Sequence, residues 1–148
     1  MEWLLYVSGL ISPDRYATLF NADGRFADCP SDIALTAARI LTEPAKHRGQ
    51  TYTVTGPVEY SHDELATEFS RVLDVGLPFE QVTVTTFLEL IGQSDDTAKL
   101  KQFEAVTIDQ QEGRLAGITD AAQRILGQPL VTVEEFINQH HSLFDSAT

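Results

Sequence analysis

The side chains with the most chemical potential in this sequence are its histidines and the acidic residues beside them. His140 and His141 are adjacent, and on a helix they point about 100° apart, so they cannot share one metal ion as an i, i+4 pair does. His62 precedes Asp63 and Glu64, and acids in a first helical turn suit the helix dipole without a catalytic role. The sequence therefore predicts no metal site and no catalytic residue.

Glycines that could hold a phosphate are also missing. A dinucleotide site needs a glycine-rich turn between a strand and a helix, so that backbone amides and the helix N-terminus meet the pyrophosphate. The closest pair of glycines here is Gly113 and Gly117, so neither that turn nor a P-loop can be drawn. We therefore expect no cofactor to bind this chain alone.

Four large aromatic residues are the candidates for contact with a ligand. Trp3 and Tyr6 lie in the opening segment, and Phe87 and Phe103 lie in the predicted mid-chain helices. Such side chains suit an apolar small molecule, so a pocket between these segments is one interpretation. Plain core or dimer packing of the same rings is the other, and the sequence leaves both open.

Composition and charge narrow the class of protein. The 148 residues, of which 43% are hydrophobic and 22% charged, predict one globular domain over residues 1–148. The net charge of −12 disfavours nucleic acid and anionic lipid surfaces as partners. No apolar run approaches the ~18 residues of a spanning helix, and the N-terminus lacks the basic flank of a signal peptide. The single cysteine, Cys29, excludes an intrachain disulfide, and we expect a cytoplasmic protein.

Short strands and helices alternate along the chain, which predicts an α/β or α+β fold with few strands and about six helices. The clearest helix signal is the capping box of Ser61 and Glu64, and Ser12 before Pro13 also resembles a helix start. The expected helices cover residues 32–42, 61–73, 85–91, 94–112, 120–126 and 132–144, and the expected strands cover a short stretch ending at Phe26 and residues 51–55 and 79–84.

The helix predicted over residues 32–42 has an apolar stripe. Ile33, Ala37, Ile40 and Leu41 recur at i, i+4, i+7 and i+8, which is the spacing of one helix side. The alanines of this helix would let that side approach a sheet closely. The β-rich sequence TYTVT at residues 51–55 follows and predicts a strand.

Three stretches, in this order, resemble the C-terminal half of NmrA-like proteins, a branch of the atypical short-chain dehydrogenase/reductases. They are DIALTAARILTEPAKHRGQTYTVTGP at residues 32–57, SHDELATEFSRVL at 61–73 and ITDAAQRILGQPLVTVEEF at 118–136. The opening MEWLL is similar to the family's segment that enters the substrate pocket, with Trp3 where the family usually has Asn. The resemblance implies a truncated Rossmann-like C-terminal portion with few strands.

The family's full-length members carry roughly as many residues again before this portion, and those residues hold the glycine-rich NAD(P) turn and the first strands of the sheet. Without them, the alanine-rich helix, the segment at residues 1–11 and one or both edges of the strand at residues 51–55 would be bared. We therefore expect a homodimer in which the exposed strand or the N-terminal helix packs against a second copy, or a complementing Rossmann-type chain that supplies the missing half.

Two functions follow from the resemblance and from the missing phosphate-binding turn. The first is a non-catalytic binding or interaction module, derived from a reductase substrate domain and acting as a homodimer. The alternative is an NAD(P)-dependent oxidoreductase or redox-sensor subunit that works only with a separate Rossmann half.

Overall fold

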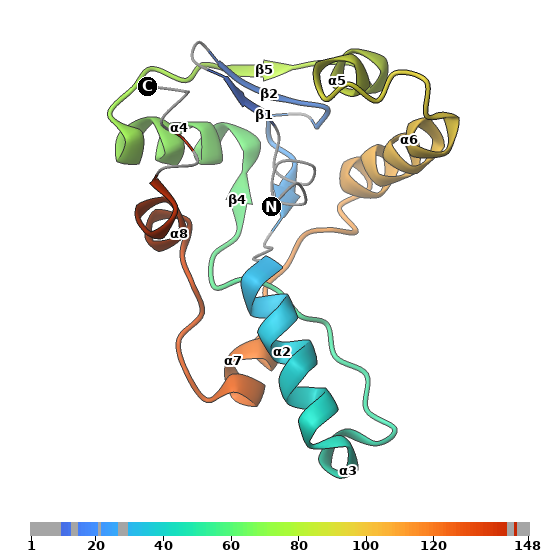
Figure 1. The fold of residues 1–148 in the computed structure, drawn as a ribbon, viewed down its shortest axis with the longest axis vertical. Coiled ribbons are helices and arrows are strands. Elements are labelled where there is room, and N and C mark those ends of the chain that lie inside the picture. Colours follow the sequence, from blue (N-terminus) through green and yellow to red (C-terminus); the bar gives the residue numbers. More distant parts are fainter. Residues whose placement is uncertain (1–9, 13–14, 21, 27–29, 142–143, 145–148) are drawn as a thin grey trace.

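The structure is a computed structural model that describes residues 10–12, 15–20, 22–26, 30–141 and 144. Its larger sheet has three strands in the order β1 (Leu10–Ser12), β2 (Arg15–Thr18) and β5 (Phe79–Gln81) (Figure 1). β1 pairs antiparallel with β2, and β2 pairs parallel with β5. A second sheet pairs β3 (Arg25–Phe26) with β4 (Tyr60–Ser61).

The described residues form seven helices, and this mixed α/β architecture confirms the predicted fold class. The prediction of about six helices did not include one starting at Pro44, which was expected to stop the preceding helix. Proline is tolerated at a first helical position, where its missing N–H has no intrahelical partner. The helices are α2 (Pro30–Thr42), α3 (Pro44–His47), α4 (His62–Leu73), α5 (Val84–Leu90), α6 (Thr97–Gln111), α7 (Ala121–Leu126) and α8 (Val133–Gln139).

The helix start predicted at Ser12 and Pro13 is wrong, because the chain forms strands there. Residues 16–18 are all buried, and β2 lies between two other strands. A strand whose two faces are both covered is buried on successive residues, a pattern that local spacing does not separate from a helix. The N-terminal residues 1–9 lie outside the described residues.

The first hydrophobic core is built on α4. Leu65, Phe69 and Leu73 follow one another every fourth residue and are buried, so they form one side of the helix. They pack with Tyr16 of β2 and Ile137 of α8 in a single cluster. This cluster joins the larger sheet to the C-terminal helix.

Capping boxes start both helices of this core, and the sequence predicts the one at Ser61 and Glu64. The Ser61 hydroxyl accepts from the Glu64 N–H at 3.1 Å, and the Glu64 carboxylate accepts from the Ser61 N–H at 2.8 Å. Thr132 and Glu135 repeat the arrangement at the start of α8. Between the two helices, Arg71 of α4 donates to Glu134 of α8 at 2.7 Å. An exposed ion pair of this kind contributes at most about 1 kcal/mol, so the apolar contact matters more.

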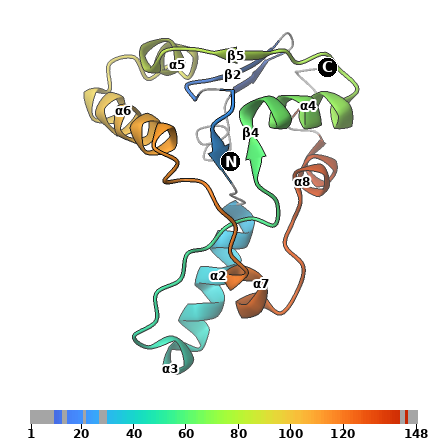
Figure 2. The same ribbon diagram turned by 180° about the vertical axis from the view of Figure 1, so that it is seen from behind.

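α2, α3 and α7 lie away from the larger sheet, below it in Figure 1, and the same separation is seen from behind (Figure 2). The side of α2 that faces its neighbours carries Asp32 and Thr36, both buried. The Asp32 carboxylate accepts from the backbone N–H of Val131 at 2.9 Å. The predicted apolar stripe does not face a sheet among the described residues: Ile33 is 39% exposed and Leu41 is 78% exposed.

The strand predicted at residues 51–55 is also absent from the described structure. This segment has no strand partner there, and its contacts run through side chains instead. The Thr119 hydroxyl donates to the Thr53 carbonyl at 2.5 Å, and the Thr119 N–H donates to the Thr55 hydroxyl at 2.9 Å. A β-rich sequence forms a strand only when a backbone partner is present.

None of the helices in the described ranges is long and apolar enough to cross a membrane.

The capping box of α4 predicts a pH-dependent stability. The Ser61 N–H, by donating to the Glu64 carboxylate, holds the pKa of Glu64 below its ordinary value. A depressed folded pKa stabilises the protein above the unfolded pKa of about 4.3, and this contribution is lost as the pH falls through the folded pKa. We expect Glu64→Ala to lower the free energy of unfolding at pH 7, and the difference from wild type to shrink in acid.

Urea unfolding at several pH values measures this difference. Glu104→Ala, on the exposed part of α6, is the control and should show no such pH-dependent gap. A Glu64→Ala deficit that is the same at pH 7 and in acid would contradict the role of the ionised cap.

Candidate functional site

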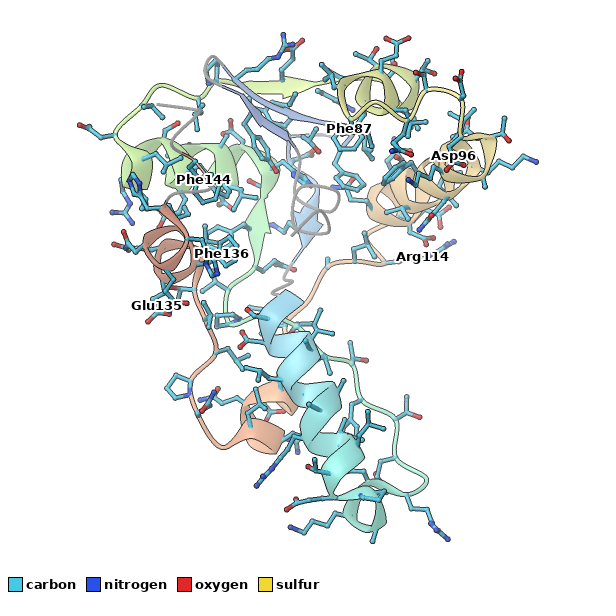
Figure 3. The ribbon with its side chains drawn as sticks, viewed as in Figure 1. Phe87, Asp96, Arg114, Glu135, Phe136 and Phe144 are labelled. Atoms are coloured by element: carbon cyan, nitrogen blue, oxygen red, sulfur yellow. The ribbon has the colours of Figure 1, made fainter. Side chains whose placement is uncertain are left out.

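The structure brings together two of the four aromatic residues predicted to line a pocket. Phe87 of α5 and Phe103 of α6 are buried, and their rings meet edge to face with centroids 5.6 Å apart. Phe87 lies below the larger sheet, toward α6 (Figure 3). Trp3 and Tyr6 lie outside the described residues, so the pocket formed by all four remains a prediction.

Further rings, of which sequence analysis considered only His62, continue from this pair. Phe20, which follows β2, is in the same buried cluster as Phe87 and Phe103. Its ring stacks on the His62 ring with centroids 5.0 Å apart, and His62 Nδ1 shares a hydrogen bond of 3.1 Å with the Tyr16 hydroxyl. These residues come from separate parts of the chain, so no local spacing could have found them.

The rings of Phe20, His62, Phe87 and Phe103 form an aromatic region. The Tyr16 hydroxyl, which is hydrogen-bonded to His62, has the most strongly shifted pKa beside this region. Burial raises the pKa of Tyr16 far above its ordinary value, because the phenolate would be left without water. The phenol therefore stays protonated at physiological pH. With Tyr16 and His62 both almost fully buried, the hydrogen bond holds the start of α4 against β2, and neither side chain is open to solvent for proton transfer.

Gln110 is, after the Tyr16 hydroxyl, a second buried polar group that sequence analysis missed. It is only 3% exposed, and neither its amide nitrogen nor its amide oxygen has a hydrogen-bond partner in the structure described. It lies two helical turns after Phe103, and these two residues form the buried side of α6. The amide is pressed against the turn at Gly24, where an added Cβ would lie 1.1 Å from Gln110 Nε2. A buried amide without partners is a candidate binding group, because it is costly to stability and needs another reason to be kept.

Two hollows lie open to solvent on the described surface. One of about 470 Å³ is lined by residues 92–98, and another of about 380 Å³ is lined by residues 120–129, mainly at Gln123, Arg124 and Gln128. Neither is lined by the rings of the aromatic region. The described residues contain no group of three His, Cys, Asp or Glu side chains that could hold a metal ion.

The residues present do not fit the phosphates of a dinucleotide. Gly113 and Gly117, the closest pair of glycines, both have positive φ in a fully exposed loop. They follow α6 and are not a turn between a strand and a helix, as a pyrophosphate site requires. The expectation that no cofactor binds this chain alone stays a prediction.

Comparison with known proteins gives the fold a context. No family model matches the chain. Among curated proteins, the NAD(P)H azoreductase of Xenophilus azovorans is 31% identical over an alignment covering 78% of this chain and 41% of that protein. A (4-alkanoyl-5-oxo-2,5-dihydrofuran-3-yl)methyl phosphate reductase of Streptomyces griseus is 26% identical, with 78% of this chain and 40% of that protein covered.

Solved structures agree with these sequence matches. The Citrobacter sp. triphenylmethane reductase complexed with NADP(H) superposes with a TM-score of 0.66 at 25% identity, over 83% of this chain and 44% of that one. The NADPH-dependent quinone oxidoreductase of Escherichia coli gives a TM-score of 0.69 at 22% identity, over 87% of this chain and 45% of that one. The mixed α/β structure of this chain matches part of the Rossmann-like fold of these proteins. It spans less than half the length of each of these proteins.

The non-catalytic module predicted from the sequence is wrong, because the proteins that the chain resembles are named as reductases. The prediction depended on the absence of a glycine-rich turn. That absence is uninformative when the matched region is only 40% to 45% of each relative, since the phosphate-binding residues of a relative can lie entirely in the remainder.

The unpartnered amide of Gln110 predicts a gain in stability on substitution. Gln110→Met keeps the length of the side chain and removes two buried polar atoms, so we expect it to raise the free energy of unfolding by about 1 to 3 kcal/mol. Chemical denaturation measures this change. Gln111→Met, at the exposed neighbouring position, is the control and should change stability by less than about 0.5 kcal/mol. A destabilised Gln110→Met variant would show that the amide has a partner in solution.

Proposed function

We propose that this chain is the substrate-side part of an NAD(P)H-dependent reductase of the NmrA-like type, completed by a separate dinucleotide-binding part. The observation that carries the proposal is the 31% identity to the azoreductase of Xenophilus azovorans, which extends over 78% of this chain. The fold shared with the triphenylmethane reductase and the quinone oxidoreductase supports it. Because these relatives are named as reductases, a reductase is favoured over a redox sensor.

The proposed substrate is an apolar, conjugated acceptor. The names of three of the relatives refer to azo compounds, triphenylmethane dyes and quinones, which carry flat, conjugated rings, and a fourth is named for a methyl phosphate ester of a dihydrofuran. Four segments of this chain contribute rings to one aromatic region, namely Phe20, His62, Phe87 and Phe103. These rings are buried against one another in the described structure, so the proposal of a conjugated acceptor rests on the names of the relatives.

The work is divided between the two parts. We assign dinucleotide binding to the completing part, because the described residues contain no glycine-rich turn between a strand and a helix. This chain's contribution is to bind and orient the acceptor and to exclude water from it. The buried hydrogen bond between Tyr16 and His62 serves this indirectly, because it fixes the ring on which Phe20 stacks.

A chimera tests the proposal. In it, this chain replaces the matched region of the Xenophilus azovorans azoreductase, and the rest of that enzyme is retained. We expect the chimera to oxidise NAD(P)H in the presence of an azo dye, a triphenylmethane dye or a quinone. The isolated chain should not, and NAD(P)H should not raise its melting temperature, since a ligand present at a hundredfold excess over Kd would add about 2.7 kcal/mol to stability.

The native azoreductase is the positive control, and a chimera with this chain's sequence shuffled is the negative one. A chimera whose melting temperature rises with NAD(P)H but which reduces none of the three acceptor classes would contradict the proposal. A melting shift of the isolated chain with NAD(P)H would contradict the division of work.

A further inference from the structure

Two buried side-chain oxygen atoms of α2 lack hydrogen-bond partners. Asp32 and Thr36 are each 1% exposed, and neither Asp32 Oδ1 nor Thr36 Oγ1 has a partner in the part of the chain that the structure describes. The other carboxylate oxygen of Asp32 is occupied, because it accepts from the Val131 N–H. A buried polar atom that is left unpaired lowers stability, so two of them on one side of a helix require an explanation.

The spacing of the two side chains suits a small molecule between them. Asp32 and Thr36 are four residues apart, so they lie on the same side of α2 with Cβ atoms about 5 to 6 Å apart. Their unpaired oxygens do not bond to each other directly. Two hydrogen bonds of about 2.8 Å each span up to about 5.5 Å, so a single small molecule can reach both oxygens.

The Thr36 hydroxyl also makes no hydrogen bond to its own helix. Thr67 of α4 and Thr107 of α6 donate to the carbonyl oxygen four residues earlier, at 3.0 and 2.8 Å, which is a usual partner for a helical threonine. The corresponding carbonyl for Thr36 is that of Asp32, and no such bond is present in the described structure. The hydrogen of the Thr36 hydroxyl therefore needs another acceptor.

The buried side chains next to this pair, in the described segments, are apolar. α7 packs beside α2 in both views (Figures 1 and 2), and its buried residues are Ala121 and Ala122. Leu130, which precedes Val131, is buried as well. None of these three side chains has an atom that could donate to a carboxylate or accept from a hydroxyl.

We infer that Asp32 and Thr36 bind one internal water molecule, which donates to Asp32 Oδ1 and accepts from the Thr36 hydroxyl. A carboxylate oxygen only accepts, and the hydroxyl has a hydrogen to donate, so the bound molecule must both donate and accept. Water does both. A metal ion would coordinate the two oxygens but would leave the hydroxyl hydrogen without an acceptor. Buried water in proteins commonly joins polar groups that would otherwise be unpaired.

The bound water would complete a polar joint between α2 and the segment after α7. Asp32 reaches the Val131 N–H, 99 residues away in the sequence, with one carboxylate oxygen. The water joins the other carboxylate oxygen to Thr36, so three segments of one hydrogen-bonded network fix the position of α2. The inference goes beyond the proposed function and does not depend on it, because the site lies entirely within this chain.

Thr36→Val tests the inference by the direction of its effect. Valine has nearly the shape of threonine but no hydroxyl, so the variant removes one partner of the water. We expect the melting temperature of the full chain to fall by about 3 °C or more. Thr67→Val, at an exposed helical position, is the matched control and should change the melting temperature by less than about 2 °C. A melting temperature of Thr36→Val equal to or above that of wild type would overturn the inference, because removing an unpaired buried hydroxyl does not destabilise a protein.

Magnetic relaxation dispersion of 17O water is the second test, because it counts water molecules that stay inside a protein for longer than nanoseconds. We expect Thr36→Val to hold one such molecule fewer than wild type. Thr36→Ser keeps the hydroxyl and should hold the same number as wild type, even where the lost methyl group lowers its melting temperature. Equal counts in wild type and Thr36→Val would overturn the inference.

The identity of the bound molecule is tested with salts. The melting temperature of wild type should be the same in sodium, potassium and choline chloride at equal ionic strength, and the same should hold for Thr36→Val. A wild-type melting temperature that is higher in sodium or potassium, with no such difference in Thr36→Val, would show that a metal ion occupies the site and would overturn the assignment of water.

Discussion

The burial of one side of α4 is the interaction on which most of the described structure depends. Leu65, Phe69 and Leu73 pack against Tyr16 of the larger sheet and Ile137 of α8. Burying one such side chain stabilises a protein by about 1.5 to 3 kcal/mol, several times more than an exposed ion pair such as Arg71 with Glu134 contributes. The sheet, the central helix and the C-terminal helix are therefore held together by one apolar contact region.

The same contact region sets the geometry of the aromatic region. His62, the first residue of α4, lies between Tyr16 and Phe20, with a hydrogen bond to the former and a stacked contact to the latter. Phe20 belongs to the second cluster, which includes Phe87 and Phe103. A shift of α4 would therefore move the rings of the second cluster, so the packing of the two clusters is physically coupled in this chain.

Local signals in the sequence predicted the local structure well. The capping box of Ser61 and Glu64 occurs as expected, and the helices predicted over residues 61–73 and 120–126 are present as α4 and α7. Features that depend on distant partners were missed: the orientation of α2 follows from a hydrogen bond between Asp32 and Val131, 99 residues apart. The contact between Tyr16 and His62 and the burial of the Gln110 amide were missed for the same reason, because each depends on residues far away in the sequence. The function was mispredicted from a missing motif, which is weak ground when the matched proteins are more than twice the length of the matched region.

The open side of α2, beside a segment rich in β-formers, has a consequence for the life of the polypeptide in a cell. Exposed apolar helices and unpaired strand edges are the features by which chaperones and proteases sort incompletely assembled chains. Copies in which this side of α2 stays exposed would be degraded faster than copies in which it is covered. The steady-state amount of this polypeptide would then depend on the amount of the protein part that covers this side of α2. The dosage of the chain would be controlled in this way without a regulatory site.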